Sequence, residues 1–177
     1  MGKALSVAFL FCLLSFAFSE PGDAENVKGG GEVLGYWVGY DEVTNVKNSV
    51  IYVYKYDGKV YGRIMNVVRE GRVYDVNNPS GTRVVGFDHL GIEGLDFMWG
   101  LEYFPNHEKW DRGKIIDPKN GKVYGSEMRV DPKTGDLVTR GKVWVFGRTK
   151  VWKRAVENEI PRSDVGELVP NPPVVGQ

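Results

Sequence analysis

The sequence predicts an all-β protein: an antiparallel up-and-down β-barrel of about eight strands. Apolar and polar residues alternate with a period of two and not 3.6. The alternating runs are short, rich in Val, Ile, Tyr and Trp, and separated by clusters of Gly, Asp, Asn and Pro. Because the runs follow one another through tight turns, a meander that closes on itself explains them best, since closure removes the exposed edges of an open sheet.

The first nineteen residues have the pattern of a secretory signal peptide. Lys3 supplies a basic start, residues 4–18 form an apolar run, and Ala17-Phe18-Ser19 provides the small residues that signal peptidase needs. The run is too short to span a bilayer and is followed by Glu20 and Pro21. We therefore expect cleavage after Ser19, a periplasmic or secreted protein, and no membrane span.

The rest of the chain divides into three parts. Residues 20–33 are glycine-rich and predict a flexible leader, and residues 34–154 hold most of the apolar residues and predict the barrel domain. Residues 155–177 carry four prolines and predict an extended or disordered tail with at most a short helical turn at its start. At 177 residues, one domain is expected.

Composition excludes several classes of site. Cys12 is the sole cysteine and lies in the signal sequence, so the mature protein has no disulfide, no cysteine nucleophile and no thiolate zinc site. The 23 basic and 23 acidic residues give a net charge of zero, which provides no electrostatic reason to expect nucleic acid as a partner. Neither a metal nor a cofactor is expected.

The alternating runs give the expected strands, which are residues 34–40, 49–56, 59–68, 82–88, 95–103, 113–117, 122–130 and 137–153, the last with a break at Gly147.

A two-residue turn at Asp57-Gly58 fixes the register of the second and third strands, because both of its positions need positive φ. One face then pairs Ile51 with Ile64 and Val53 with Gly62. The other pairs Tyr54 with Tyr61 and Tyr52 with Arg63. We expect the aliphatic face to point inward and Arg63 to lie over Tyr52. The alternative is that the tyrosines line a ligand pocket.

The later runs predict two more turns. Two-residue pairing around Asn120-Gly121 sets Lys114 opposite Glu127 on the outside and leaves Tyr124, Ser126, Met128 and Val130 facing in. After the turn at residues 131–136, Trp144 and Phe146 fall on the outward set, where they need cover from the tail, a loop or a partner.

Two patterns at the ends of the domain predict how the barrel closes. Gly35-Tyr36-Trp37 begins the first strand, and the last strand carries Arg148 and Arg154. An aromatic ring at one seam and a cation at the other can stack. We expect Trp37 to be buried with Arg148 or Arg154 within about 6 Å of its ring.

Three spaced motifs carry a family resemblance: Gly58–Ile64, Gly113–Tyr124 and Gly147–Arg154. In order and spacing they resemble the bacterial exported family called domain of unknown function 2147, over about residues 35–154. The resemblance implies a secreted or periplasmic bacterial protein and brings no activity, substrate or catalytic residue.

The Gly35-x-Trp37 motif with a late arginine also resembles the calycin group, the lipocalins and their relatives. In that group a tryptophan on the first strand packs near an arginine from the last, at the closed end of the barrel. The chain is shorter than typical lipocalins and lacks disulfides. The resemblance therefore concerns architecture and transfers no ligand.

The sequence gives little support for a catalytic site. His89 and His107 lie in separate loop-like stretches and are read as surface residues. Glu93, Asp96 and Glu102 flank an aromatic stretch and keep a carbohydrate-active hydrolase open as a minor alternative. No catalytic residue is assigned.

The preferred hypothesis is a non-catalytic binder of a small lipophilic or amphiphilic ligand inside the barrel. The candidate ligand-binding residues are Trp37, Ile51, Val53, Ile64, Tyr124, Met128 and Arg148, with Trp37 and Arg148 closing one end. The alternative is a cell-envelope protein-interaction module that uses the outer aromatics Trp144 and Phe146 and the proline-rich tail.

Overall fold

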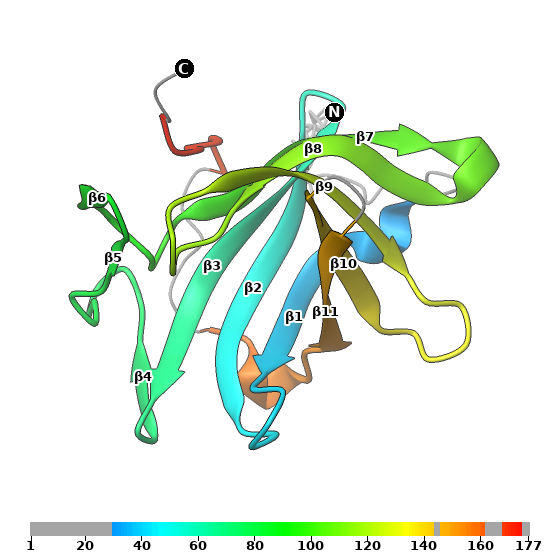
Figure 1. The fold of residues 1–177 in the computed structure, drawn as a ribbon. Coiled ribbons are helices and arrows are strands. Elements are labelled where there is room, and N and C mark those ends of the chain that lie inside the picture. The colour runs from blue at the N-terminus through cyan, green and yellow to red at the C-terminus, as the bar shows by residue number, and fades with distance from the viewer. Residues whose placement is uncertain (1–29, 144–145, 162–167, 175–177) are drawn as a thin grey trace, which may run out of the picture.

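Eight antiparallel strands close into one barrel, as the sequence predicts (Figure 1). The computed structural model describes residues 30–143, 146–161 and 168–174, with the backbone alone at 143 and 146. The barrel strands are β1 (Gly35–Tyr40), β2 (Lys47–Tyr56), β3 (Lys59–Arg69), β7 (Asp96–Phe104), β8 (Lys109–Ile116), β9 (Val123–Val130), β10 (Leu137–Val143) and β11 (Phe146–Arg154). Each pairs with its neighbour along the chain, and β11 pairs with β1 to complete the ring.

The expected number of barrel strands is right, but two of the assignments differ. Residues 82–88 do not form a barrel strand. They contribute to the separate hairpin β5 (Arg83–Val84) and β6 (Phe87–Gly91), because Gly86, with φ of 81°, turns the run back on itself. Together with β4 (Arg72–Tyr74), this hairpin belongs to the excursion between β3 and β7.

The expected long last strand is two strands, β10 and β11. They pair as a hairpin in which Val143 lies opposite Phe146 and Lys142 lies opposite Gly147. The break therefore precedes Gly147. Because residues 137–153 form two barrel strands, the total stays at eight although residues 82–88 form none.

The β2–β3 hairpin has the predicted register, with Ile51 opposite Ile64 and Val53 opposite Gly62. Ile51 and Val53 are fully buried in the core, which confirms that the aliphatic face points inward. The tyrosines lie on the outer wall, where the rings of Tyr54 and Tyr61 stack with centroids 5.5 Å apart. Arg63 lies over Tyr54, at 5.2 Å, and not over Tyr52 as expected.

The β8–β9 turn is longer than the sequence reading assumed. Lys114 lies opposite Gly125 and not opposite Glu127. The reason is local: Asp117 N–H donates to the Lys122 carbonyl, and the Asp117 carboxylate accepts from the backbone N–H of Lys119. The turn consequently spans residues 117–122.

Three short 3₁₀ turns accompany the strands of the described residues. η1 (Gly31–Val33) precedes β1, η2 (Pro105–His107) joins β7 to β8, and η3 (Glu157–Glu159) follows β11. Residues 30–33 were expected to belong to a flexible leader, but Val33 is fully buried. The expected signal peptide, residues 1–19, lies outside the described residues.

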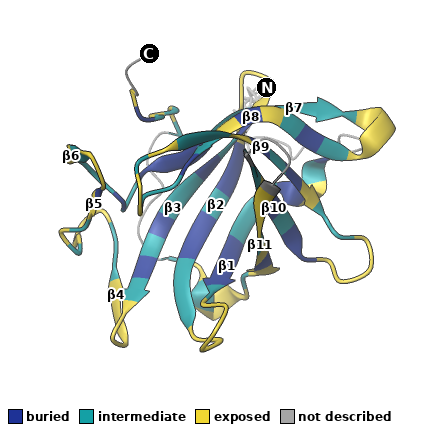
Figure 2. Cartoon of the chain, in the orientation of Figure 1, coloured by how far each residue is buried: buried dark blue, intermediate teal, exposed yellow. Residues whose placement is uncertain are grey.

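The core lies inside the barrel, and buried positions concentrate along its strands while most turns are exposed (Figure 2). Three tryptophans, Trp37, Trp110 and Trp152, belong to this core. The ring of Phe97, on β7, reaches that of Trp152, on β11, with centroids 6.0 Å apart. Because these strands lie on different sides of the ring of strands, side chains occupy the lumen at this level.

Candidate functional site

One end of the barrel is sealed by η1 and two tryptophans. The indole N–H of Trp37 donates to the Val33 carbonyl at 2.8 Å, and that of Trp110 donates to the Gly30 carbonyl at 2.9 Å. Trp37 is fully buried, as predicted. We call this the closed end.

Arg154 completes the closed end. Its guanidinium carbon lies 3.7 Å from the centroid of the Trp37 ring, which confirms that a late arginine stacks there. It also donates to the carbonyls of Leu34, at 2.6 Å, and Glu32. Burial is the main cause of a lowered Arg154 pKa.

Arg148, the arginine assigned to this closure in the sequence reading, lies elsewhere. Its side chain is 72% exposed, and its nearest carboxylate is that of Glu42, at 3.7 Å. Arg148 shares the inward parity of Arg154 on β11, but it lies six residues closer to the opposite end of the strand. We call that end, formed by the turns β1–β2 and β8–β9, the mouth.

The other candidate ligand-binding residues divide by depth. Ile51, Val53 and Met128 are fully buried in the core, and Ile64 packs against it while partly buried. Tyr124 is partly buried near the mouth, and its hydroxyl accepts from the Asn120 amide at 3.3 Å. The structure therefore places the first three in packed wall, and their ligand-binding role stays a prediction.

Lys150 is the inner-wall residue that the sequence reading missed. It lies on β11 opposite Thr139 of β10, one inward position from Trp152, and its ammonium nitrogen is 4.9 Å from the centroid of the Trp152 ring. Among the described residues no carboxylate lies within ion-pair distance of this ammonium. Desolvation is the main cause of its lowered pKa.

A second inward polar group lies near this level. Ser126, on β9, is 1% exposed, and its hydroxyl has no hydrogen-bond partner among the described residues. Thr139 is buried as well, but its hydroxyl accepts from the Trp152 indole at 3.0 Å. An unsatisfied buried hydroxyl is costly and calls for a ligand or a water molecule.

Charges of both signs surround the mouth. The charges that act on Lys150 are Glu42 and Asp41 from the β1–β2 turn, Lys119 from the β8–β9 turn, and Arg148. The pKa of Asp41 is lowered, chiefly by backbone hydrogen bonds from Thr44 and Val43. Its carboxylate therefore bonds within the β1–β2 turn. Of the two acidic residues, Glu42 alone pairs across the rim, with Arg148.

The carboxylates considered for hydrolysis do not converge. Asp96 is fully buried on the outer wall with Arg63, at 2.9 Å. Glu102 pairs with Lys59 at 3.1 Å, and Glu93 accepts from the backbone N–H of Ser80 at 3.2 Å. Each has its own structural partner, so the arrangement shows no acid–base pair around a common cleft.

The remaining candidate groups give no site either. His89 and His107 are exposed, and no cluster of three potential metal ligands occurs in the described part of the chain. No helix within the described ranges has the length and apolar character needed to cross a membrane. Trp144 lies outside the described residues, as does the side chain of Phe146, so their role as a partner surface stays a prediction.

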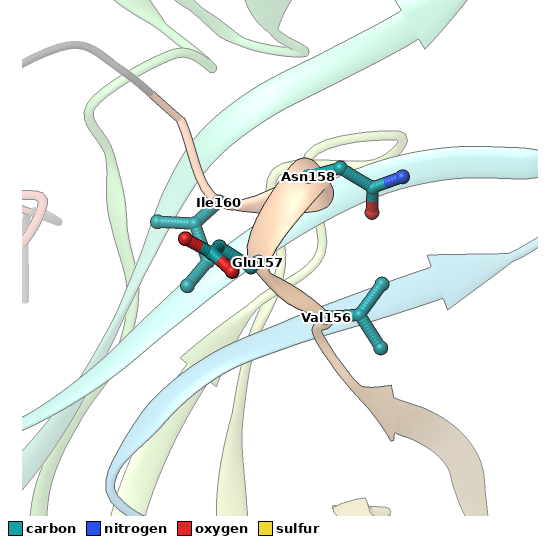
Figure 3. Close-up of a pocket in the computed structure, with 4 residues that line it drawn as sticks. All are labelled: Val156, Glu157, Asn158 and Ile160. Carbon is teal, nitrogen blue, oxygen red and sulfur yellow. The ribbon is translucent and has the colours of Figure 1, made fainter.

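Two concavities occur on the outside of the barrel. One, of about 580 Å³, is lined by Val156, Glu157, Asn158 and Ile160 around η3 (Figure 3). The other, of about 140 Å³, lies across β8 to β11 and includes Lys109, Glu127 and Arg140 in its lining. The first is bordered by a single short segment and the second by surface ion pairs. Neither gathers the features of the inner wall.

Comparison with known proteins agrees with this architecture. Residues 35–154 match the model of a family described as uncharacterized proteins conserved in bacteria, DUF2147. The chain belongs to the DUF2147 family. The match starts at Gly35 and ends at Arg154, so both strands of the closing pair β1–β11 lie inside it. No curated protein matches the sequence.

A solved structure similar to this DUF2147 protein is that of protein HP1028 from the human pathogen Helicobacter pylori, described as belonging to the lipocalin family. The TM-score is 0.53 with 19% sequence identity, over 71% of this chain and 84% of that one. At this identity the similarity concerns the fold alone. It supports the lipocalin-like architecture that Trp37 and Arg154 display at the closed end.

Proposed function

We propose that the protein is a non-catalytic binder of a small amphiphile with an acidic head, received in the mouth half of the barrel with its head beside Lys150. The proposal rests on one observation above all: an inward, half-buried lysine that no described carboxylate neutralises. A buried ammonium without a partner is costly, and an anion that supplies one gains the corresponding free energy.

The packing of the core determines how deep such a ligand can lie. Trp37 and Trp152 lie nearer the closed end, and Phe97, at the mouth end of β7, reaches Trp152 across the lumen. The mouth half contains Lys150, so an anionic head can take a charged hydrogen bond there, and the enclosed Ser126 hydroxyl can add a neutral one once neighbouring side chains move aside. The apolar part of the ligand then contacts partly buried side chains of the mouth half such as Ile115 and Tyr124.

The signal-like residues 1–19 support a place of action outside the cytoplasm. The absence of a converging acid–base pair among the described carboxylates supports binding over hydrolysis. The place of action outside the cytoplasm and the non-catalytic role both belong to the proposal.

The test compares dodecanoate with dodecanol, which share a chain and differ in head-group charge. Calorimetric titration of the wild-type protein at pH 7 is expected to show tighter binding of dodecanoate. Lys150→Met is expected to weaken dodecanoate about tenfold or more and to change dodecanol little, since only the anion uses the ammonium. Lys133→Met, in the exposed β9–β10 turn, is the matched control.

Two results contradict the proposal. One is that neither compound binds the wild-type protein at concentrations below its micelle threshold. The other is that Lys150→Met and Lys133→Met bind dodecanoate equally well.

A further inference from the structure

The outer wall of the barrel carries a buried ion pair that the lumen does not use. Asp96, at the start of β7, is fully buried, and the side chain of Arg63 on β3 is 12% exposed. Arg63 donates to Asp96 Oδ1 through Nε and to Oδ2 through Nη2, both at 2.9 Å. The Tyr54 hydroxyl donates to Asp96 Oδ2, also at 2.9 Å. These three side chains are called the outer-wall triad below.

The carboxy-terminal segment 168–174 lies on the outer-wall triad and hydrogen-bonds to it through its main chain. Arg63 Nη2 donates to the Val169 carbonyl at 2.8 Å, and the Asn171 backbone N–H donates to Asp96 Oδ2 at 2.6 Å. Arg63 is thus the hydrogen-bond donor and Asp96 the acceptor for two backbone groups of the segment that are two residues apart.

The sequence of the segment matches this hydrogen-bonding pattern. Within residues 170–173, Pro170, Pro172 and Pro173 have no backbone N–H, so Asn171 carries the one donor, and Asp96 accepts it. Pro173 is buried. Prolines also hold the segment extended before it docks, which reduces the entropy lost on binding. The segment has the chemistry of a ligand for an aromatic wall.

The wall beside the triad is aromatic. Tyr54 is 3% exposed, stacks on Tyr61 at 5.5 Å, and lies 6.1 Å from Tyr52. Aromatic rings with a polar anchor are the surfaces on which extended proline-rich segments dock. Tyr54 has a raised pKa, mainly because of its burial and then because of Asp96, so its hydroxyl stays a hydrogen-bond donor to the carboxylate.

From these contacts we infer that the outer-wall triad and its tyrosines form a binding site for short proline-rich segments of the type x-Pro-Asn-Pro-Pro, which the protein's own residues 168–174 fill in cis. The same site accepts such a segment in trans, from a second copy of the chain, when the attached tail is displaced. This peptide site lies on the opposite face of the barrel wall from the lumen and is independent of any amphiphile bound there.

The test uses the full chain and a blocked peptide of residues 168–174 with a fluorescent label. Asn171→Pro with Pro173→Asp in the chain removes the donor and the buried proline of the attached tail. We expect fluorescence anisotropy to show that this variant binds the peptide, and that the wild-type chain binds it at least tenfold more weakly because the attached tail competes at a high effective concentration.

Replacement of one backbone hydrogen atom of the peptide by a methyl group separates recognition from nonspecific adhesion. Methylation of the Asn171 backbone nitrogen removes the donor to Asp96 and keeps every side chain. The methylated peptide should bind the variant chain about tenfold or more weakly, since a hydrogen bond to a carboxylate is lost. This comparison does not depend on whether a substitution at Asp96 folds.

Three outcomes overturn the inference. The peptide fails to bind the variant chain, or the methylated peptide binds as well as the unmodified one. The third is that the wild-type chain binds the peptide as tightly as the variant chain does, since the attached tail would then not occupy the site.

Discussion

Replacement of Arg154 by Met tests the closure of the barrel directly. The substitution removes the cation 3.7 Å from the Trp37 ring and two hydrogen bonds, to the carbonyls of Leu34 and Glu32. A partly exposed cation–π contact contributes about 0.5–1 kcal/mol. Each hydrogen bond contributes about 1 kcal/mol net. Because Arg154 retains solvent contact, we expect a total loss of about 2 kcal/mol in the free energy of unfolding.

Urea unfolding followed by tryptophan fluorescence and by circular dichroism measures this loss. A decrease of about 2 kcal/mol corresponds to a fall of roughly 5–8 °C in Tm for a domain of this size. The summed tryptophan emission should also shift to longer wavelength in the folded state, because η1 loses its link to β11 and water gains access to the Trp37 ring.

Arg148→Met is the matched control, on the same strand and with the same inward parity. Arg148 is 72% exposed and its ion pair with Glu42 spans 3.7 Å, so its loss should change the free energy of unfolding by less than about 0.5 kcal/mol. Equal losses for the two variants, or no loss for Arg154→Met, would refute closure by this contact.

Three further predictions concern other parts of the barrel. Since desolvation lowers the pKa of Lys150, dodecanoate affinity should fall as pH rises, beginning below the titration range of an ordinary lysine, and calorimetry of Lys150→Met should show no such fall. Burial raises the pKa of Asp111, but hydrogen bonds from Lys142, the Arg112 backbone and Lys109 outweigh it and lower this pKa to about 2. The ionised carboxylate therefore stabilises the fold above pH 4 by about 1 kcal/mol. In urea unfolding, the difference in the free energy of unfolding between the wild-type protein and Asp111→Asn should vanish as pH falls from about 5 to 2. Gly113→Ala should cost about 2–3 kcal/mol in thermal unfolding, because its Cβ would clash with the buried Leu101 side chain, whereas Gly125→Ala, whose Cβ finds its nearest neighbour at 3.8 Å, should be close to neutral.

Local patterns predicted the barrel well because they determine local structure. The Asp57-Gly58 turn fixed the β2–β3 register residue by residue, and alternation assigned Ile51 and Val53 to the inside. The β8–β9 turn was misread because side-chain hydrogen bonds of Asp117 extend it, and these depend on three-dimensional geometry that dipeptide preferences do not contain.

The choice between Arg148 and Arg154 required information that alternation lacks. Both residues have the same parity on β11, and only the stagger of β11 against β1 places Arg154 beside Trp37. Lys150 has the same parity as well. It lies two residues before Trp152 on the strand, and this spacing alone predicts that the two side chains point to the same face. It was overlooked because charged residues on strands usually face water.

The docked tail illustrates a third kind of limit. Its composition is typical of disorder, and its partners are remote: Val169 lies 106 residues from Arg63, and Asn171 lies 75 residues from Asp96. Nothing in the segment itself identifies them. A buried Asp96 opposite Arg63 follows only once β3 and β7 are known to be neighbours.

The seam between β1 and β11 has a kinetic consequence. Arg154 bonds to Leu34 across 120 residues of sequence, so the ladder that completes the ring is the least local one in the barrel and carries the largest chain-closure entropy. A circular permutant that links the two domain ends and opens the chain at Asp57-Gly58 keeps every strand neighbour. It turns that seam into a hairpin and makes β2–β3 the distant pair. Its refolding rate, compared with that of the natural order, would reveal which ladder limits barrel formation.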